Sequence, residues 1–502
     1  MGSKIVMVPK IEKKAVGRGA AYIYIETIAS LISGYIFWII VSKITTSEII
    51  GISSALISFA GIVSVIANIG VPAGVLRFLG RSFSEKKLDE AKKMVLVAFL
   101  LICMGIAACS LTIVIVQNSI QNIFNFDLPL LLIAILFVCS SALSMLFRSV
   151  VISSLNTRSL PIIIISSSIV KLILTVILLL IGTGVVGLTI GFTSAHVMTS
   201  ILLSVIVVRT IFKKSSVNNL FANFFAISKS ILVSSIVYWI PFLITTIGSQ
   251  LGTIVVFGSQ GASQAGVYFL ALTIITGITN VMNSLFTIAL PTLSGLRDYR
   301  KRVAWNTIRF SALILLPFTC SLIFYSDEIM GLFGRNYTNG SVSLEMLLLS
   351  MLPMVVLSGI NTLVYSYGNY RNVLMIGLAV SVPRTLLYFV LVPLYGGTGA
   401  AVGYTIGTII GCLVSLLIAR TIGMQIFWKK LGFIFIVPTA LAFVLAYYQV
   451  NFVLGIIATT VLSYLILLKA HIVTGSDLQD LLMILPESFS NRINKFVSKL
   501  GI

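Results

Sequence analysis

Two cationic side chains stand inside long apolar segments of the sequence. Lys171 follows Arg158 by thirteen residues, and Arg384 follows Arg371 by thirteen residues, 213 positions further along the chain. At 1.5 Å per residue, each cation would lie roughly 20 Å along a helix from its arginine, near the middle of a bilayer. A charge at that depth costs at least ~2.5 to 3.5 kcal/mol, so such residues usually face a protein interior or a wet cavity. Two cations at equal depth would suit an anionic ligand such as a phosphate or diphosphate.

Two further charged residues are candidates for the same site. Glu26 lies about six residues into the first apolar segment, where it could pair with a cation, bind a coupling proton or sodium ion, or reach the headgroups. Arg148 would be buried about 12 Å below Asn156 if its segment continues as a helix that far. The alternative for Lys171 and Arg384 is that each snorkels, or pairs with backbone and a neighbouring acid. We predict no catalytic residue and no metal ligand.

The segments that carry these residues belong to a chain that is apolar throughout. Of 502 residues, 58% are hydrophobic and 10% are charged, whereas a soluble domain carries about 25% charged residues. Apolar runs of about 20 residues recur along the chain, and a helix of that length crosses a ~30 Å hydrocarbon core. We therefore predict an all-α membrane protein with about fourteen spans. They lie near residues 20–42, 49–71, 94–116, 129–151, 161–182, 187–209, 231–256, 266–290, 306–326, 344–366, 373–392, 399–420, 431–449 and 453–469.

Basic residues alternate from one side of the predicted spans to the other. If the N-terminus is cytoplasmic, 30 of the 34 Lys and Arg residues lie on the inside, only Lys43 and Arg335 lie outside, and Lys171 and Arg384 lie within spans. The positive-inside rule predicts such an asymmetry, and an error of one helix would scramble it. We therefore predict a multi-pass protein of the cell membrane with both termini in the cytoplasm. The net charge of +20 then reflects orientation rather than nucleic-acid binding.

An internal repeat organises the spans. Asn156-Thr157-Arg158 matches Asn369-Tyr370-Arg371, and GLTIG at residues 187–191 matches GYTIG at residues 403–407. Two pseudo-symmetric lobes of six helices with the same orientation are predicted, an architecture of transporters that bind their substrate between the lobes. The predicted segments are a cytoplasmic N-terminal segment at 1–19, an N-lobe at 20–209, a cytoplasmic linker at 210–230, a C-lobe at 231–420, two additional spans at 431–469 and a cytoplasmic amphipathic tail at 470–502.

Other side chains that could react or be modified stand apart from this pattern. The five cysteines lie inside apolar runs without metal-ligand spacing, and we interpret them as core residues. His196, alone on an apolar span, is expected to pack and hydrogen-bond rather than to bind a ligand. Asn336 and Asn339 each begin a glycosylation sequon in the predicted outside loop between spans nine and ten. Glycosylation at either asparagine would confirm that this loop is extracytoplasmic.

Patterns of small and apolar residues in the second half are moderately specific to one family. They are Leu332-Phe333-Gly334 with Tyr337, Tyr367-Gly368-Asn369, the run from Pro393 to Ala401, and a tail from Ser476 to Pro486. In these features the chain resembles the polysaccharide-transporter (Wzx-like) branch of the multidrug/oligosaccharidyl-lipid/polysaccharide (MOP) exporter superfamily. The resemblance covers essentially the whole chain.

The resemblance implies two six-helix lobes around a central cavity, alternating access, and translocation of a lipid-linked oligosaccharide or polysaccharide precursor from the cytoplasmic to the outer leaflet. The implied partners are a sugar on a polyprenyl- or dolichyl-phosphate type lipid, membrane lipid and glycan-assembly enzymes. No cofactor is implied, and coupling to a proton or sodium gradient is left open. Lys171 and Arg384 would attract the phosphate region, an assignment that follows from charge and depth rather than from a family motif.

Two other functions stay open. An ion-coupled multidrug exporter of the same superfamily should have an acid-rich N-lobe and cationic substrates, whereas Glu26 is the one clear intramembrane acid of this sequence. A membrane-embedded glycosyltransferase or polymerase should carry its reactive residues in sizeable outside loops, and the predicted outside loops are short. The sequence therefore favours a transporter of an anionic substrate over an enzyme.

Overall fold

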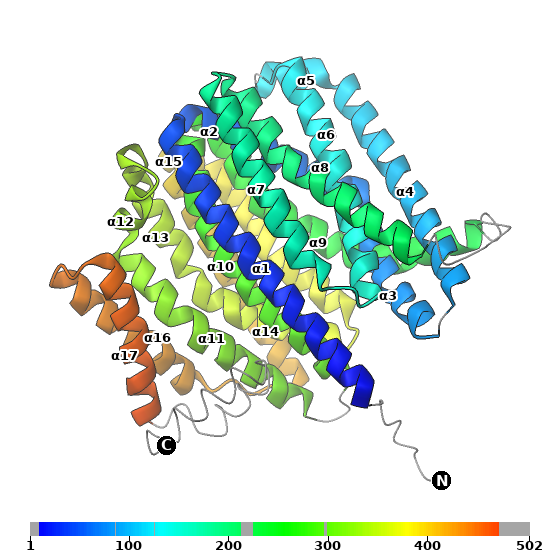
Figure 1. Ribbon diagram of the computed structural model, residues 1–502. Helices are drawn as coiled ribbons and strands as arrows, with labels where there is room; N and C mark the ends of the chain where they lie inside the picture. Colours follow the sequence, from blue (N-terminus) through cyan, green and yellow to red (C-terminus); the bar gives the residue numbers. More distant parts are fainter. Residues whose placement is uncertain (1–9, 86, 125, 212–223, 296–298, 471–502) are drawn as a thin grey trace, which may run out of the picture. The chain divides into compact units, whose positions relative to one another are not determined.

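The computed structural model describes residues 10–85, 87–124, 126–211, 224–295 and 299–470. Helices joined by short turns make up these residues, and no strand occurs among them. Figure 1 shows the helices as long rods, as expected of segments that cross a bilayer. The prediction of an all-α membrane protein is confirmed.

Thirteen helices of the described residues are long and apolar enough to span a membrane, so the chain is a multi-pass membrane protein. The first six are α1 (Lys10–Ile44), α2 (Ser47–Asn68), α4 (Leu88–Ile115), α6 (Leu128–Ser153), α7 (Ser159–Leu180) and α8 (Gly184–Thr210). The others are α9 (Phe224–Gln260), α10 (Ala262–Gly295), α11 (Arg300–Phe324), α13 (Ser341–Leu349) continued by α14 (Met351–Ser366), α15 (Tyr370–Ile422), α16 (Trp428–Tyr447) and α17 (Phe452–Lys469).

Helix α15 contains two spans rather than one. It has 53 residues, which corresponds to about 80 Å of helix, more than twice the thickness of a ~30 Å hydrocarbon core. Its backbone leaves the helical conformation at Gly396, where φ is 57° and ψ is −136°. The predicted spans 373–392 and 399–420 are the two halves on either side of this break, so the prediction of about fourteen spans holds.

Four short helices connect the spans and were not predicted. They are α3 (Val71–Ser84), α5 (Gln117–Phe124), α12 (Ser326–Gly331) and the 3-10 helix η2 (Arg335–Gly340). Several spans are also longer than predicted, because hydrogen bonding continues past the apolar run into polar residues. For example, α1 begins by Lys10 rather than at residue 20, and α9 begins at Phe224 rather than at residue 231.

Some predicted segments lie partly outside the described residues. These are residues 1–9 of the N-terminal segment, residues 212–223 of the linker, and residues 471–502, which include nearly all of the amphipathic tail. The cytoplasmic location of the two termini stays a prediction from the distribution of basic residues.

The chain divides into two compact units. The first contains Met1–Leu270 and Thr385–Ala400, and the second contains Ala271–Arg384 and Ala401–Ile502. The division cuts through α10 and α15, whereas the predicted lobes are defined by the sequence repeat, so these lobes stay a prediction. In the first unit, α7 packs against both α1 and α8 (Figure 1). In the second unit, α11 packs against α14, α16 and α17.

Within the first unit, the beginnings of α2 and α10 pack very closely. The hydroxyl oxygens of Ser47 and Ser263 are 2.7 Å apart. A Cβ added at Gly51 would collide with the backbone of Ala262, and one added at Gly266 would collide with the backbone of Ser47. Glycines thus let the two backbones touch, in the manner of small-residue contacts between membrane helices. We call this contact the α2–α10 seal.

Candidate functional site

Lys171 lies on the buried face of α7. The exposed face of this helix is a stripe of isoleucines at helical spacing, namely Ile162, Ile165, Ile169, Ile173 and Ile177. The buried face carries Ile163, Ser167, Lys171 and Thr175, four residues apart from one another. Because 3.6 residues complete a turn, the two stripes lie on opposite sides of the helix. Lys171 therefore points into the protein and away from the lipid side.

The ammonium group of Lys171 is surrounded by aromatic rings. Its Nζ atom lies 4.2 Å from the centre of the Phe37 ring and 5.2 Å from that of Phe192, and the residue is only 9% exposed. No hydrogen bond or ion pair joins Nζ to another residue of the described chain. Ring faces attract a cation but accept no strong hydrogen bond, so the three N–H groups of the ammonium remain available to an anion.

Arg384 is buried in the second unit, between the two halves of α15. It is 3% exposed, and its Nη2 atom donates a hydrogen bond of 2.8 Å to the Thr408 hydroxyl. The guanidinium carbon lies 3.6 Å from the centre of the Tyr404 ring. Its Nε atom is buried without a hydrogen-bond partner. Like Lys171, Arg384 is a cation held by a ring with no acid against it in the described residues.

The two cations occupy hairpins that are built alike. In the first hairpin Lys171 contacts Phe192, the residue directly after GLTIG, and in the second Arg384 bonds to Thr408, the residue directly after GYTIG. In both hairpins the last glycine of the motif touches the helix that carries the cation. A Cβ at Gly191 would collide with Thr175, and one at Gly407 would come within 2.7 Å of Arg384 Cβ. The motif therefore brings each cation-bearing helix against its partner.

Glu26 and Arg148 form an ion pair between α1 and α6. Arg148 Nε donates to Glu26 Oε1 at 2.9 Å, and Nη2 donates to Oε2 at 2.9 Å. The Glu26 side chain is 10% exposed and that of Arg148 is 42% exposed. Helix α6 ends at Ser153 and does not continue to Asn156, and the depth of Arg148 in the membrane stays a prediction.

The structure therefore separates the predicted site residues into three places. Glu26 and Arg148 are paired with each other. Lys171, on α7, lies beside Phe37, which is further along α1 than Glu26. Arg384 belongs to the second unit, so the facing of Lys171 and Arg384 across a shared cavity stays a prediction. Phe37, Phe192, Tyr404 and Thr408 were not predicted. The repeat offered a signal for the last three, since they lie in or directly after the repeated glycine motif.

The remaining predicted residues are placed as follows. His196 packs against Phe137 and Phe192, with ring centres 4.7 and 6.0 Å away. The five cysteines are free thiols, and no group of potential metal ligands occurs among the described residues. Asn336 and Asn339 are both exposed on η2, and their glycosylation stays a prediction.

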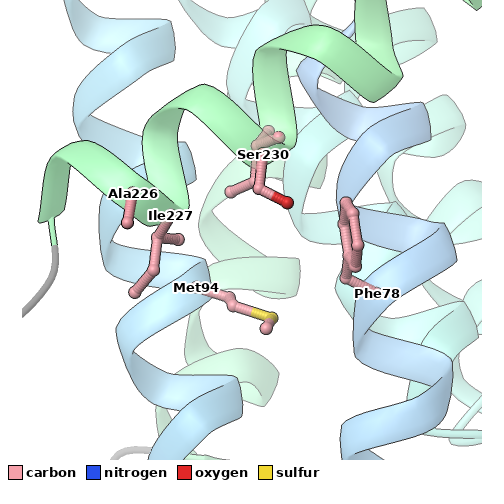
Figure 2. A pocket seen from close by; sticks show the side chains of 6 residues that line it. Phe78, Met94, Ala226, Ile227 and Ser230 are labelled. Atoms are coloured by element: carbon pink, nitrogen blue, oxygen red, sulfur yellow. The ribbon is translucent and has the colours of Figure 1, made fainter.

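A separate cavity of about 280 Å³ opens between α3, α4 and α9. Figure 2 shows Phe78 on α3 and Met94 on α4, opposite Ala226, Ile227 and Ser230 of α9. The Ser230 hydroxyl is the one side-chain polar group of this lining. Such a cavity has no group that could balance the charge of an anion, so the candidate anion site is at the buried cations instead.

Comparison with known proteins identifies the family. A model of the polysaccharide biosynthesis protein family matches residues 26–343. The chain belongs to this family. The resemblance to proteins of polysaccharide biosynthesis, inferred from the sequence, is thus confirmed at the level of this family.

Similar proteins cover between 76% and 88% of the chain. An uncharacterized membrane protein of Methanocaldococcus jannaschii is 22% identical over 404 residues, 76% of this chain and 93% of that protein. Among solved structures, the lipid II flippase MurJ in an inward closed conformation has a TM-score of 0.67 and 18% identity, covering 88% of this chain and 96% of MurJ. An inward-facing multidrug resistance MATE transporter of the MOP superfamily has a TM-score of 0.59 and 16% identity, covering 79% of this chain and 94% of that transporter. At these identities the two structures show the fold that the chain shares with them.

Proposed function

We propose that this protein is a flippase that moves a lipid-linked oligosaccharide or polysaccharide precursor from the cytoplasmic to the outer leaflet by alternating access. Membership of the polysaccharide biosynthesis protein family and the fold shared with the lipid II flippase MurJ support the proposal. The observation that carries it is Lys171, a buried cation that has aromatic rings and no acid as its described neighbours.

The physical problem of such a flippase is the charge of the sugar phosphate, which cannot enter hydrocarbon unaided. A cation within the bundle lowers that penalty by providing an opposite charge and hydrogen-bond donors. Lys171 supplies both, and because no described acid neutralises it, a phosphate would not have to displace a competitor. Arg384 supplies a second cation, also without an acid partner among the described residues. The lipid tail would stay between the predicted lobes, in contact with membrane lipid.

Several finer features belong to the same proposal. The lipid carrier is of the polyprenyl- or dolichyl-phosphate type, and glycan-assembly enzymes supply and consume the substrate. Translocation breaks and forms no covalent bond, so the protein is a transporter and not an enzyme. Coupling to a proton or sodium gradient would use Glu26, the buried acid of α1.

The proposal is tested by flipping in proteoliposomes. Purified protein is reconstituted with a polyprenyl-diphosphate-linked sugar placed in one leaflet, and the sugar that reaches the other leaflet is measured with a membrane-impermeant probe. We expect Lys171→Ala to lower the initial rate by about 10- to 100-fold. This range corresponds to the ~1.5–3 kcal/mol of a hydrogen bond to a charged group, at ~1.4 kcal/mol per tenfold change.

Lys229→Ala is the matched control, because it removes the same charge from an exposed position on α9 and should leave the rate within about twofold. Equal rates for wild type and Lys171→Ala would refute the role of Lys171. Transfer of sugar to an acceptor by the purified protein would instead show that the protein is a glycosyltransferase.

A multidrug exporter is the second candidate, because the fold is also shared with a multidrug resistance MATE transporter. Cationic drugs should bind poorly beside Lys171 and Arg384, since like charges repel in a medium of low dielectric constant. The same proteoliposomes loaded with ethidium separate the two functions. Gradient-driven ethidium export without sugar flipping would support the exporter.

A further inference from the structure

We propose that Arg148 is a second binding station for the substrate phosphate, and that Glu26 covers it until the phosphate takes its place. The inference rests on the proposed flippase function and concerns how the anion enters the site. Glu26 acts as a stand-in for the phosphate, because its two carboxylate oxygens occupy the guanidinium edge that a phosphate would use.

The first argument is the shape of the pair. Arg148 presents Nε and Nη2 to the two oxygens of Glu26, each at 2.9 Å. The planar guanidinium fork binds carboxylate and phosphate oxygens in this same two-pronged way. A site that holds a carboxylate with this geometry can therefore hold a phosphate without rearranging the arginine.

The second argument is the unequal exposure of the partners. The Glu26 side chain is 10% exposed, whereas the Arg148 side chain is 42% exposed. No hydrogen bond occupies Nη1 of Arg148 within the described chain. The open side of the pair is thus the arginine side, and a phosphate can approach the guanidinium before the ion pair breaks.

The third argument is the position of the pair along α1. Glu26 precedes Phe37, the ring beneath Lys171, by eleven residues, or about 16 Å of helix. Arg148 and Lys171 therefore contact α1 at two positions along the helix, and only Arg148 is paired with an acid there. In the proposed route, a phosphate that moves from Arg148 to Lys171 would travel about this distance along α1.

The consequence is that Glu26 weakens anion binding. A carboxylate and a phosphate that share one guanidinium repel each other, because like charges at close range interact strongly wherever water is partly excluded. Removing the charge of Glu26 while keeping its shape should therefore strengthen the binding of a diphosphate to the open arginine.

The experiment measures binding of geranylgeranyl diphosphate to the purified full-length protein by titration calorimetry in detergent, with geranylgeraniol as the control for tail binding. We expect Glu26→Gln to tighten binding by at least about tenfold, since one charge repulsion of this kind is worth more than the ~1.4 kcal/mol of a tenfold change. The gain should disappear in the double variant Glu26→Gln/Arg148→Gln. An affinity that is unchanged or weaker in Glu26→Gln, or a gain that persists without Arg148, would overturn the inference.

A second variant covers the case in which Glu26→Gln does not fold. Glu26→Met/Arg148→Met replaces the pair by apolar side chains of similar size, which proteins usually tolerate better than a broken pair. We expect this variant to bind no more tightly than wild type, and tighter binding would contradict a station at Arg148.

The result also separates this inference from the proposed function. Binding that is lost in Lys171→Ala but insensitive to Glu26 and Arg148 would overturn the second station alone. No measurable binding in wild type and in Glu26→Gln would overturn the anion assignment of Lys171 as well, and the proposed function with it.

Discussion

Two residues at equivalent positions of the repeat hold a positive charge by different means. Lys171 places a compact ammonium between two phenyl rings, and Arg384 lays a flat guanidinium against Tyr404 and a threonine hydroxyl. Neither arrangement includes an acid among the described residues, so both leave a buried charge only partly compensated. Such charges lower stability, and replacing them by apolar residues is often neutral or stabilising. Their presence is therefore best explained by a ligand.

The residue-scale prediction separates stability from transport. Arg384→Met should abolish flipping while leaving the thermal unfolding temperature in detergent unchanged or raised, because methionine fills the volume without a charge to desolvate. Flipping in proteoliposomes and thermal unfolding are measured on the same preparation. Arg420→Met, at an exposed position in the last turn of α15, is the control and should retain flipping. A large loss of stability in Arg384→Met would show that the arginine is structural.

At the scale of elements, the hairpin from α7 to α8 and the one within α15 depend on glycine. Gly191 and Gly407 each face the helix that carries a cation, at a separation that leaves no room for a methyl group. By contrast, a Cβ added at Gly34 on α1 would have no atom within 4 Å. Replacing glycine by alanine should therefore change the free energy of unfolding in opposite directions at the two motif glycines and at Gly34.

We predict that Gly191→Ala and Gly407→Ala each lower the free energy of unfolding by about 1–3 kcal/mol, the usual effect of overpacking. Gly34→Ala should raise it by about 0.5–1 kcal/mol, because alanine favours a helix interior more than glycine does. Denaturant titration of the three variants measures the order of their free energies of unfolding. Equal stability of Gly191→Ala and Gly34→Ala would show that the α7–α8 contact can relax.

The sequence was a good guide to the spans and a partial guide to the site. Hydrophobic length and the sorting of basic residues predicted the number of spans, since both follow from the bilayer. They could not predict where helices continue into polar residues, as at Lys10, or the short helix α3, because neither depends on the hydrocarbon core. The sequence indicated that Lys171 faces the protein interior, and its 9% exposure agrees. The contact of Lys171 with Phe37 could not be predicted, because α1 and α7 are far apart in the sequence and no spacing relates them.

At the scale of the molecule, the α2–α10 seal joins one helix from each predicted lobe. Ser47 and Ser263 meet at 2.7 Å, and Gly51 and Gly266 bring the backbones together. By the predicted topology, both helices begin on the outside of the membrane, so the seal would close the outer end of a path between the lobes. Alternating access then requires that it opens in every cycle.

We predict that Ser47→Cys/Ser263→Cys forms a disulfide under oxidising conditions and that the oxidised protein does not flip its substrate. Reduction should restore flipping to within about twofold of wild type. The single variants, oxidised in the same way, are the controls and should stay active. Full flipping by protein that is shown by mass spectrometry to be cross-linked would mean that the seal does not need to open.

The break in α15 at Gly396 has a mechanical consequence. The Gln260 amide, at the end of α9, donates to the carbonyl oxygens of Val392 and Pro393 at 3.1 Å each. In a regular helix these two oxygens would accept hydrogen bonds from backbone N–H groups four residues later, at and directly after the break. A side chain of α9 thus supplies hydrogen bonds to the backbone of α15 beside the break. A movement of the corner between α9 and α10 would therefore be transmitted through these two hydrogen bonds to the part of α15 next to Gly396.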